Sequence, residues 1–188
     1  MVSRIILILI FASSAWAAEV AGVKIDDRTR VGASELELKG AGLRKRLFFQ
    51  VYAVGLYVAD RKADPISQPG LKRVAIHMLR DVGVDQFSEA LADGIRENHS
   101  AAEAKALEPR VKELAATMAE IKEASKGMAI SLDWTGAGTQ LLVNSKPVGR
   151  PIAGEDFYHA LLRIWLGERP VQDDLKKALL GERWRTTN

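Results

Sequence analysis

The sequence predicts one α+β domain in which an antiparallel sheet carries its helices on one face. Strand-like patterns stand both before and after a central pair of helical stretches. The helical stretches have apolar stripes that need a sheet face to cover. No internal repeat, low-complexity segment or linker divides the 188 residues, a length that suits a single domain.

The N-terminal residues have the pattern of a secretory signal peptide. Arg4 precedes the apolar run Ile5–Phe11, and Ser13–Ala17 ends in small residues. The run is too short to span a bilayer. We expect a signal peptide over residues 1–17, with cleavage after Ala17 or alternatively after Ala18, and therefore an exported, periplasmic protein without a transmembrane segment. An uncleaved N-terminal anchor is the alternative.

The stretch Lys39–Val58 is the centre of the predicted domain. Its second half, Leu47–Val58, is almost continuously apolar, aromatic or β-branched, which is typical of a strand covered on both faces. The glycines of Gly40–Gly42 allow a bulge or tight bend. The cationic cluster Arg44–Arg46 follows at once, so the central strand is expected to carry fixed positive charge at its entrance.

Other elements follow from periodicity and from turn residues. Strands are expected at Val20–Ile25, Ser34–Lys39 and Leu71–Val82, the last antiparallel to the central strand. Asp85 is the expected N-cap of a helix that extends to Asn98. Helix-forming residues resume at Ala101, and Pro109 is expected to start a new helix that ends at Lys126-Gly127.

The C-terminal third predicts a hairpin, an edge strand and two helices. The expected strands are Met128–Trp134, Thr139–Val143 and Val148–Ile152, the last at an edge because it contains Pro151. The expected helices are Glu155–Leu166, which ends at Gly167, and Gln172–Leu180, which ends at Gly181. The domain therefore spans residues 18–181, and residues 182–188 form a loose tail.

Composition excludes several classes of function. The chain has no cysteine, so disulfides, thiolate metal sites and thiol redox chemistry are excluded. The net charge is +3, and basic residues alternate with acidic ones, so no nucleic-acid groove is expected. His77, His99 and His159 fall on three different elements, so no metal site is expected. No nucleophile elbow or phosphate loop is present, and the sequence predicts no cofactor.

The remaining candidate is a pocket with one charged end. Arg44 presents a planar guanidinium that binds a carboxylate or enolate oxygen in bidentate fashion. Tyr52 and Tyr57 add hydroxyls to an otherwise apolar space, and Gly55 leaves room for a ligand. The alternative is that Arg44 is a surface residue and both tyrosines belong to the sheet core.

Two motifs resemble the chalcone isomerase-like family. The first is Gly-Ala-Gly-Leu-Arg at residues 40–44 followed by Tyr-Ala-Val-Gly-Leu-Tyr-Val at residues 52–58. The second runs from Asp156-Phe157 to Trp165-Leu166-Gly167, with Pro170-Val171 and Leu175-Lys176 beyond it. The resemblance covers nearly all of the chain after the signal peptide. It implies an open-faced β-sandwich.

The resemblance also implies roles for individual residues. In chalcone isomerases the arginine at the position of Arg44 holds the substrate oxyanion, and a threonine and a tyrosine hold a water against the ketone. Here Tyr52 takes the place of the threonine and Phe87 that of the tyrosine. A lysine and an asparagine of that helix appear as Ala90 and Gly94. Arginine and tyrosine together resemble instead the carboxylate grip of the non-catalytic fatty-acid-binding members.

The leading hypothesis is a periplasmic, non-catalytic binder of a fatty acid or similar amphipathic acid, with the tail between the sheet and helices bearing Phe87, Leu91 and Trp165. The expected ligand-binding residues are Arg44, Tyr52, Tyr57, Phe87 and Leu91. One alternative is an isomerase or intramolecular lyase that uses Arg44 electrostatically on an enolisable substrate. Another is a structural or partner-binding protein whose cleft is closed by side chains around Gly55. The sequence favours no particular oligomeric state.

Overall fold

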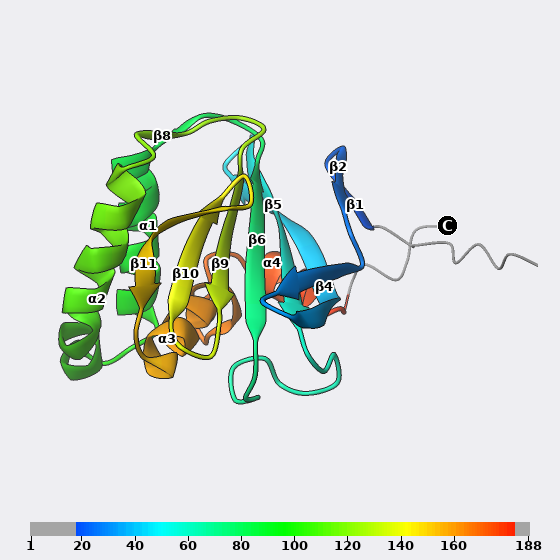
Figure 1. The fold of residues 1–188 in the computed structure, drawn as a ribbon. Helices are drawn as coiled ribbons and strands as arrows, with labels where there is room; N and C mark the ends of the chain where they lie inside the picture. Colours follow the sequence, from blue (N-terminus) through cyan, green and yellow to red (C-terminus); the bar gives the residue numbers. More distant parts are fainter. Residues whose placement is uncertain (1–17, 183–188) are drawn as a thin grey trace, which may run out of the picture.

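A seven-stranded antiparallel sheet forms the centre of the structure, a computed structural model that describes residues 18–182 (Figure 1). The expected signal peptide, residues 1–17, and residues 183–188 of the expected tail lie outside the described residues. In sheet order the strands are β11 (Lys146–Ile152), β10 (Thr139–Val143), β9 (Ala129–Trp134), β6 (Lys72–Met78), β5 (Phe49–Val58), β4 (Ser34–Arg46) and β3 (Arg28–Val31).

Four helices of the described chain pack on one face of this sheet. They are α1 (Val84–Glu97), α2 (Ala101–Ala119), α3 (Glu155–Leu166) and α4 (Asp173–Leu179). Figure 1 shows α1 and α2 side by side beyond β11, and α4 behind β4 and β5. Their buried apolar side chains form one continuous core with those of β5, β6, β9 and β10. This is the predicted α+β arrangement, an antiparallel sheet with helices on one face.

The opposite face of the sheet has its own smaller core. The hairpin of β1 (Ala18–Val20) and β2 (Val23–Ile25) covers it, and its buried side chains come from that hairpin and from β3, β4 and β5. Strand β5 is therefore covered on both faces, as its continuous apolar sequence predicts. A second short pair, β7 (Val82–Gly83) with β8 (Glu123–Ala124), joins the start of α1 to the end of α2.

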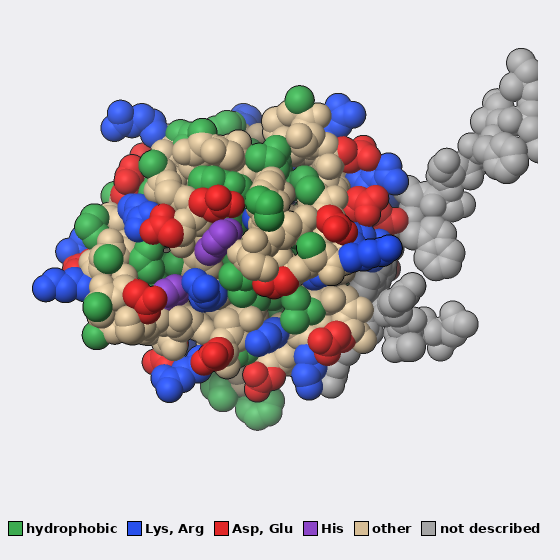
Figure 2. Space-filling view, turned by 90° about the horizontal axis from the view of Figure 1, so that it is seen from below, with side chains coloured by type: hydrophobic (Ala, Val, Ile, Leu, Met, Phe, Trp, Pro, Cys, Tyr) green, Lys and Arg blue, Asp and Glu red, His purple; other side chains and the backbone are tan. Residues whose placement is uncertain are grey.

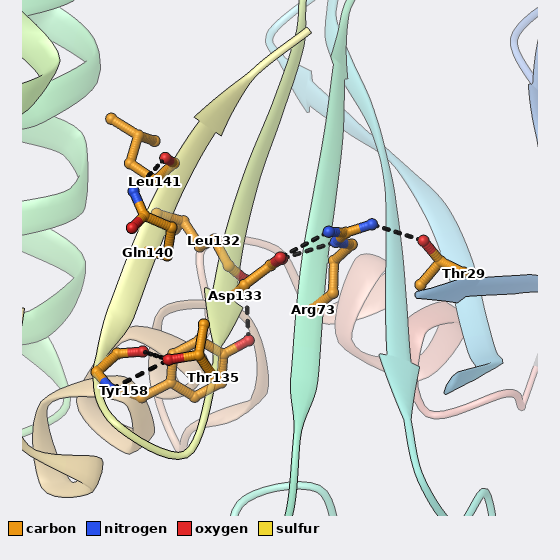
Figure 3. A network of polar contacts seen from close by, with 9 residues as sticks. Thr29, Arg73, Leu132, Asp133, Thr135, Gln140, Leu141 and Tyr158 are labelled. Carbon is orange, nitrogen blue, oxygen red and sulfur yellow. Dashed lines mark hydrogen bonds and ion pairs between the residues drawn. The ribbon is translucent and has the colours of Figure 1, made fainter. Parts of the chain in front are cut away.

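A polar cluster also lies on this second face and links distant strands (Figure 3). Arg73 on β6 donates from Nε and Nη2 to the two carboxylate oxygens of Asp133 on β9, both at 2.6 Å. The Arg73 Nη1 donates to the hydroxyl of Thr29 on β3, also at 2.6 Å. Strands β4 and β5 lie between β6 and β3 in the sheet, so the contact requires a strongly curled sheet.

The two outermost strands of the sheet are short or irregular. Strand β11 contains Pro147 and Pro151, and its pairing with β10 shifts register between Thr139 and Leu141. The edge position predicted for the segment with Pro151 is confirmed. The other edge, β3, has four residues and ends at Val31.

The stretch Lys39–Val58 differs from the prediction. Strand β4 continues through the glycines to Arg46, so the cationic cluster belongs to the preceding strand, and β5 begins only at Phe49. The glycines are needed for packing. A Cβ at Gly40 would lie 2.6 Å from the carbonyl oxygen of Leu179, and one at Gly42 would lie 2.6 Å from Leu175 Cδ1. Helix α4 can therefore approach β4 only where side chains are missing.

Other element boundaries differ as well. The expected strand Val20–Ile25 is split by a turn at Ala21-Gly22 into β1 and β2. The helix expected to start at Pro109 is part of α2, which starts at Ala101. Its N-cap, Ser100, forms a capping box with Glu103, and this start is strong enough to place Pro109 inside the helix. Helix α1 begins at Val84 after the N-cap Gly83, whereas the sequence predicted Asp85 as the cap.

None of the helices in residues 18–182 combines the length and apolar character that crossing a bilayer requires.

Candidate ligand-binding cleft

A cleft of about 890 Å³ lies between the β4–β5 hairpin and the helices α1 and α3. Its volume falls in the range of small-molecule sites. Its lining residues are Arg44, Arg46, Leu47, Phe49, Val51, Tyr52, Arg80, Asp81, Val82, Gln86, Phe87, Glu89, Ala90, Leu91, Asp93, Gly94, Glu97, Ile164, Trp165, Arg169, Pro170 and Val171. The cleft is thus apolar at its walls and charged at its mouth.

The hydroxyl of Tyr52 marks the buried end of the cleft. The side chain is 6% exposed, and its oxygen accepts a hydrogen bond of 3.0 Å from the indole N–H of Trp165. The ring of Phe87 meets the Tyr52 ring edge to face, with centroids 6.4 Å apart. The Tyr52 hydroxyl itself donates to no hydrogen-bond acceptor in residues 18–182. A buried donor is therefore held in place and still available.

Burial raises the pKa of Tyr52, so this hydroxyl keeps its proton across the physiological range. The bond from Trp165 and the charge of Arg44 both lower that pKa, as does hydrogen bonding with Arg44, without reversing the shift. Arg44 stands directly across the β4–β5 ladder from Tyr52. The guanidinium and the neutral phenol therefore face the same space.

Arg44 is held in position by the residue that precedes α4. The Arg44 Nη1 donates to the side-chain oxygen of Gln172 at 3.3 Å and to the carbonyl of Lys45. The same Gln172 oxygen accepts the backbone N–H of Lys45 at 2.8 Å, and Gln172 Nε2 donates to the carbonyl of Leu43 at 3.1 Å. Gln172 thus fixes the backbone on both sides of Arg44 as well as its side chain.

The cationic cluster divides between the cleft and the solvent. Arg44 and Arg46 line the cleft, whereas Lys45 does not and is exposed. The pairing of β4 with β5 shifts register between Arg44 and Lys45, where Val51 is the extra residue on β5. The bulge brings both Val51 and Tyr52 to the cleft, although neighbouring strand residues normally face opposite sides.

Four of the five expected ligand-binding residues line this cleft, and Tyr57 does not. Arg44 and Tyr52 come from the hairpin, and Phe87 and Leu91 from α1. Tyr57 belongs to the small core on the other face, where its hydroxyl donates to the carbonyl of Asp26 at 2.8 Å. The sequence-based grouping of Tyr57 with Tyr52 is thus corrected, since the two side chains are separated by the sheet.

Gly55 also faces away from the cleft. A Cβ there would meet Ile25, Leu38 and Tyr57 at 3.1–3.2 Å, so the space above this glycine is filled by the small core. The room that the sequence suggested at Gly55 is therefore not ligand space. The cleft depends on the gap between β5 and the helices.

Helix α1 forms an apolar wall with an acidic rim. Phe87 and Leu91 are buried, Ala90 lies between them in sequence, and Gly94 packs against Ile164 of α3. The same helix contributes exposed acidic residues to the mouth, namely Glu89, Asp93 and Glu97. The positions that the family resemblance assigns to a tyrosine, a lysine and an asparagine thus offer no polar side chain here.

Sequence reasoning missed Gln172 and the hydrogen bond between Trp165 and Tyr52. Both contacts join residues more than a hundred positions apart, so the sequence around Arg44 and Tyr52 does not indicate them. A weak signal existed for Gln172, because a polar side chain just before a helix often caps or clamps a neighbouring backbone.

Residues 18–182 contain no group of three or more His, Asp or Glu side chains placed to hold a metal ion. On the face shown in Figure 2, lysines and arginines are interspersed with acidic side chains, without an extended surface of one sign.

The comparisons with known proteins agree with this architecture. The family model described as chalcone isomerase-like matches residues 17–181. The fold is similar to the crystal structure of a fatty-acid binding protein from Arabidopsis thaliana, with a TM-score of 0.64 and 16% sequence identity over 85% of this chain and 92% of that one. At this identity the likeness shows the fold alone. No curated protein sequence matches the chain.

Proposed function

This chain belongs to the chalcone isomerase-like family, and we propose that within it the protein is a non-catalytic binder of a fatty acid or a similar amphipathic carboxylic acid. The ligand carboxylate meets Arg44 and Tyr52 at the buried end of the cleft. Its apolar tail lies against Phe87 and Leu91 of α1 and Trp165 of α3.

The observation that carries this proposal is the unused proton of the buried Tyr52 hydroxyl beside the Arg44 guanidinium. A buried hydroxyl without an acceptor costs free energy, and a carboxylate oxygen removes that cost. The half-buried guanidinium supplies the opposite charge and a geometry that suits a carboxylate. Because Trp165 and Gln172 already hold the two groups in place, little ordering entropy is lost on binding.

The cleft walls suit a ligand with an apolar body. Val82, Phe87, Leu91, Ile164 and Val171 line it from three separate segments. In chalcone isomerases one of the two groups that hold a water against the ketone is a tyrosine hydroxyl, and Phe87 of α1 offers no hydroxyl at that position. The similar fold of a fatty-acid binding protein supports the same choice.

The proposal includes export to the periplasm. It rests on the N-terminal pattern of Arg4, the apolar run Ile5–Phe11 and the small residues before Ala18. N-terminal sequencing of protein recovered from the periplasmic fraction of an expressing cell tests it, and recovery of the intact N-terminus from the cytoplasm contradicts it.

Native mass spectrometry of the purified protein, followed by titration with a long-chain fatty acid, tests the binding. We expect a stoichiometric adduct of fatty-acid mass. The Arg44→Ala variant should bind about ten to a hundred times more weakly, the scale of a lost charge-assisted hydrogen bond. Tyr52→Phe should also weaken binding, because it removes the hydroxyl donor.

The matched control is Tyr57→Phe, which removes a tyrosine hydroxyl on the opposite face of the sheet and should leave the affinity unchanged. An apo mass that stays unchanged with added fatty acid contradicts the proposal. Turnover of a chalcone that disappears in the Arg44→Ala variant would favour the isomerase alternative instead.

A further inference from the structure

Three consecutive apolar side chains project into solvent at the end of the β4–β5 hairpin. Leu47 is 85% exposed, Phe48 98% and Phe49 56%, and these are the exposed large hydrophobic residues of the described chain. We call these three residues the hairpin tip. Large apolar side chains clustered on an exposed protrusion mark an interaction surface.

The backbone of the hairpin tip indicates that folding alone does not explain its sequence. Leu47 occupies the left-handed region with φ 54°, at the first position of a two-residue turn between β4 and β5. Glycine or asparagine is favoured there, and a leucine costs conformational energy. A turn selected for stability would therefore carry a different pair of residues.

Cations surround the hairpin tip. Lys45 and Arg46 precede it in β4, and the guanidinium of Arg80 stacks on the ring of Phe49 at 4.7 Å from its centroid. Within residues 18–182, no ion pair of 4.0 Å or less engages any of these three cations. Their charge is thus available to an anionic partner.

We propose that the hairpin tip docks on the surface of an anionic phospholipid bilayer, with Leu47 and Phe48 entering the interfacial region. Aromatic and aliphatic side chains favour that region, and flanking lysines and arginines bind the lipid phosphates. A bilayer suits a convex protrusion, whereas a folded partner would have to offer a matching groove. The docking does not depend on the ligand proposed for the cleft.

The position of the hairpin tip relates the docking to the cleft. Arg46, Leu47, Phe49 and Arg80 also line the cleft, so a docked protein holds its mouth against the bilayer. The acidic side chains of α1 line the other side of the mouth. Their charge confines the contact to the hairpin side.

Cosedimentation with vesicles tests the proposal. The probes are vesicles of phosphatidylcholine alone and vesicles that also contain phosphatidylglycerol, and both are free of fatty acid. The variant Leu47→Gly with Phe48→Asn removes the apolar side chains and creates a pair of residues favoured in such turns. It should fold at least as stably as the wild type, which thermal unfolding checks. Its binding to anionic vesicles should fall at least about tenfold, since burial of one large apolar side chain accounts for that factor.

A second variant measures the electrostatic contribution to vesicle binding separately. Lys45→Gln with Arg46→Gln should weaken binding to anionic vesicles by about fivefold per charge and leave binding to pure phosphatidylcholine unchanged. Added salt should weaken the wild type in the same way. Tyr52→Phe should bind vesicles as the wild type does, so a failure of the proposed cleft function is distinguished from a failure of docking.

The proposal is wrong if the wild type does not sediment with anionic vesicles, or if the Leu47→Gly, Phe48→Asn variant sediments equally well. Sedimentation velocity tests the alternative that the hairpin tip contacts a second copy of the chain. A concentration-dependent dimer that this variant abolishes, together with no vesicle binding, would assign the hairpin tip to contact between copies of the chain.

Discussion

Gln172 controls the position of Arg44 from a different part of the chain. One amide group contacts the Arg44 guanidinium, the Lys45 N–H and the Leu43 carbonyl. These contacts occur at the bulge, where the β4–β5 ladder leaves the backbone less constrained. Gln172 is therefore a positioning residue of the proposed carboxylate site.

We expect Gln172→Ala to weaken fatty-acid affinity about fivefold, less than Arg44→Ala, because the charge remains while its orientation is lost. Titration of the purified variant followed by native mass spectrometry measures this. Gln140→Ala is the matched control, since Gln140 donates to the carbonyls of Leu141 and Val148 at the far end of the sheet. If both glutamine variants bind alike, Gln172 has no positioning role.

At the residue scale, the sequence predicts which residues a strand contains better than it predicts which face of the sheet their side chains point to. Tyr52 and Tyr57 are an odd number of positions apart, and strand alternation alone places them on opposite faces. This alternation argues against placing both hydroxyls in one pocket, and in the structure Tyr57 lies in the small core on the other face. The direction of Arg44 is different, because a bulge of one residue reverses the facing of the following residues and leaves no mark in the sequence.

At the scale of elements, periodicity fixes the helices and strands whose ends carry strong signals. The bounds predicted for α3 and β10 agree with the structure, because acidic residues and Gly167 delimit the first and a glycine-rich turn opens the second. The helix start predicted at Pro109 is wrong, because α2 begins at Ala101 and contains Pro109. The Ser-x-x-Glu pattern at Ser100 is the sequence signal for the true start, and burial of Leu107 and Leu114 offsets the free-energy cost of an internal proline.

Helix α3 also carries an acid-sensitive group. Burial lowers the pKa of His159, and nearby Lys72 on β6 lowers it further, as does Arg163 on α3. The carboxylates of Glu155 and Asp156 act in the opposite direction. The His159 Nε2 is buried without a hydrogen-bond partner in the described chain. The folded protein therefore favours the neutral imidazole.

Since the unfolded chain takes up this proton near pH 6.5 and the folded chain does so only at lower pH, the free energy of unfolding should fall as the pH drops below about 6.5. His159→Gln should make that fall smaller. Urea unfolding at about pH 7.5 and about pH 5.5, above the range where carboxylates titrate, measures the difference. His77, whose pKa burial also lowers, accounts for part of the remaining dependence. An unchanged slope in the variant would contradict the assignment.

At the scale of the whole molecule, Arg73 joins parts of the sheet that are distant in sequence. It links Asp133 on β9 to Thr29 on β3 across the curled face (Figure 3). The side chain of Asp133 is 4% exposed, and burial raises the pKa of its carboxyl while Arg73 lowers it. Burial of this ion pair costs desolvation free energy. Removal of one partner destabilises the fold, because the other charge then stays buried and unpaired.

We expect Arg73→Met to lower the free energy of unfolding by about 3–5 kcal/mol, because it leaves a buried carboxylate without its partner. Arg73→Met combined with Asp133→Leu should restore most of that loss. Urea denaturation of the two variants beside the wild type measures both effects. If the double variant is no more stable than the single one, the loss comes from the contact with Thr29 or from packing.

The edges of the sheet have a consequence for the protein at high concentration. On β11 the prolines at 147 and 151 have no N–H to donate, and β3 offers only four residues of backbone. An incoming extended chain would find too few donors and acceptors in register to template its own growth. The two edges of this sheet thereby resist fibril formation, and the exposed hairpin tip stays at the far end of two strands whose backbones are already paired with each other.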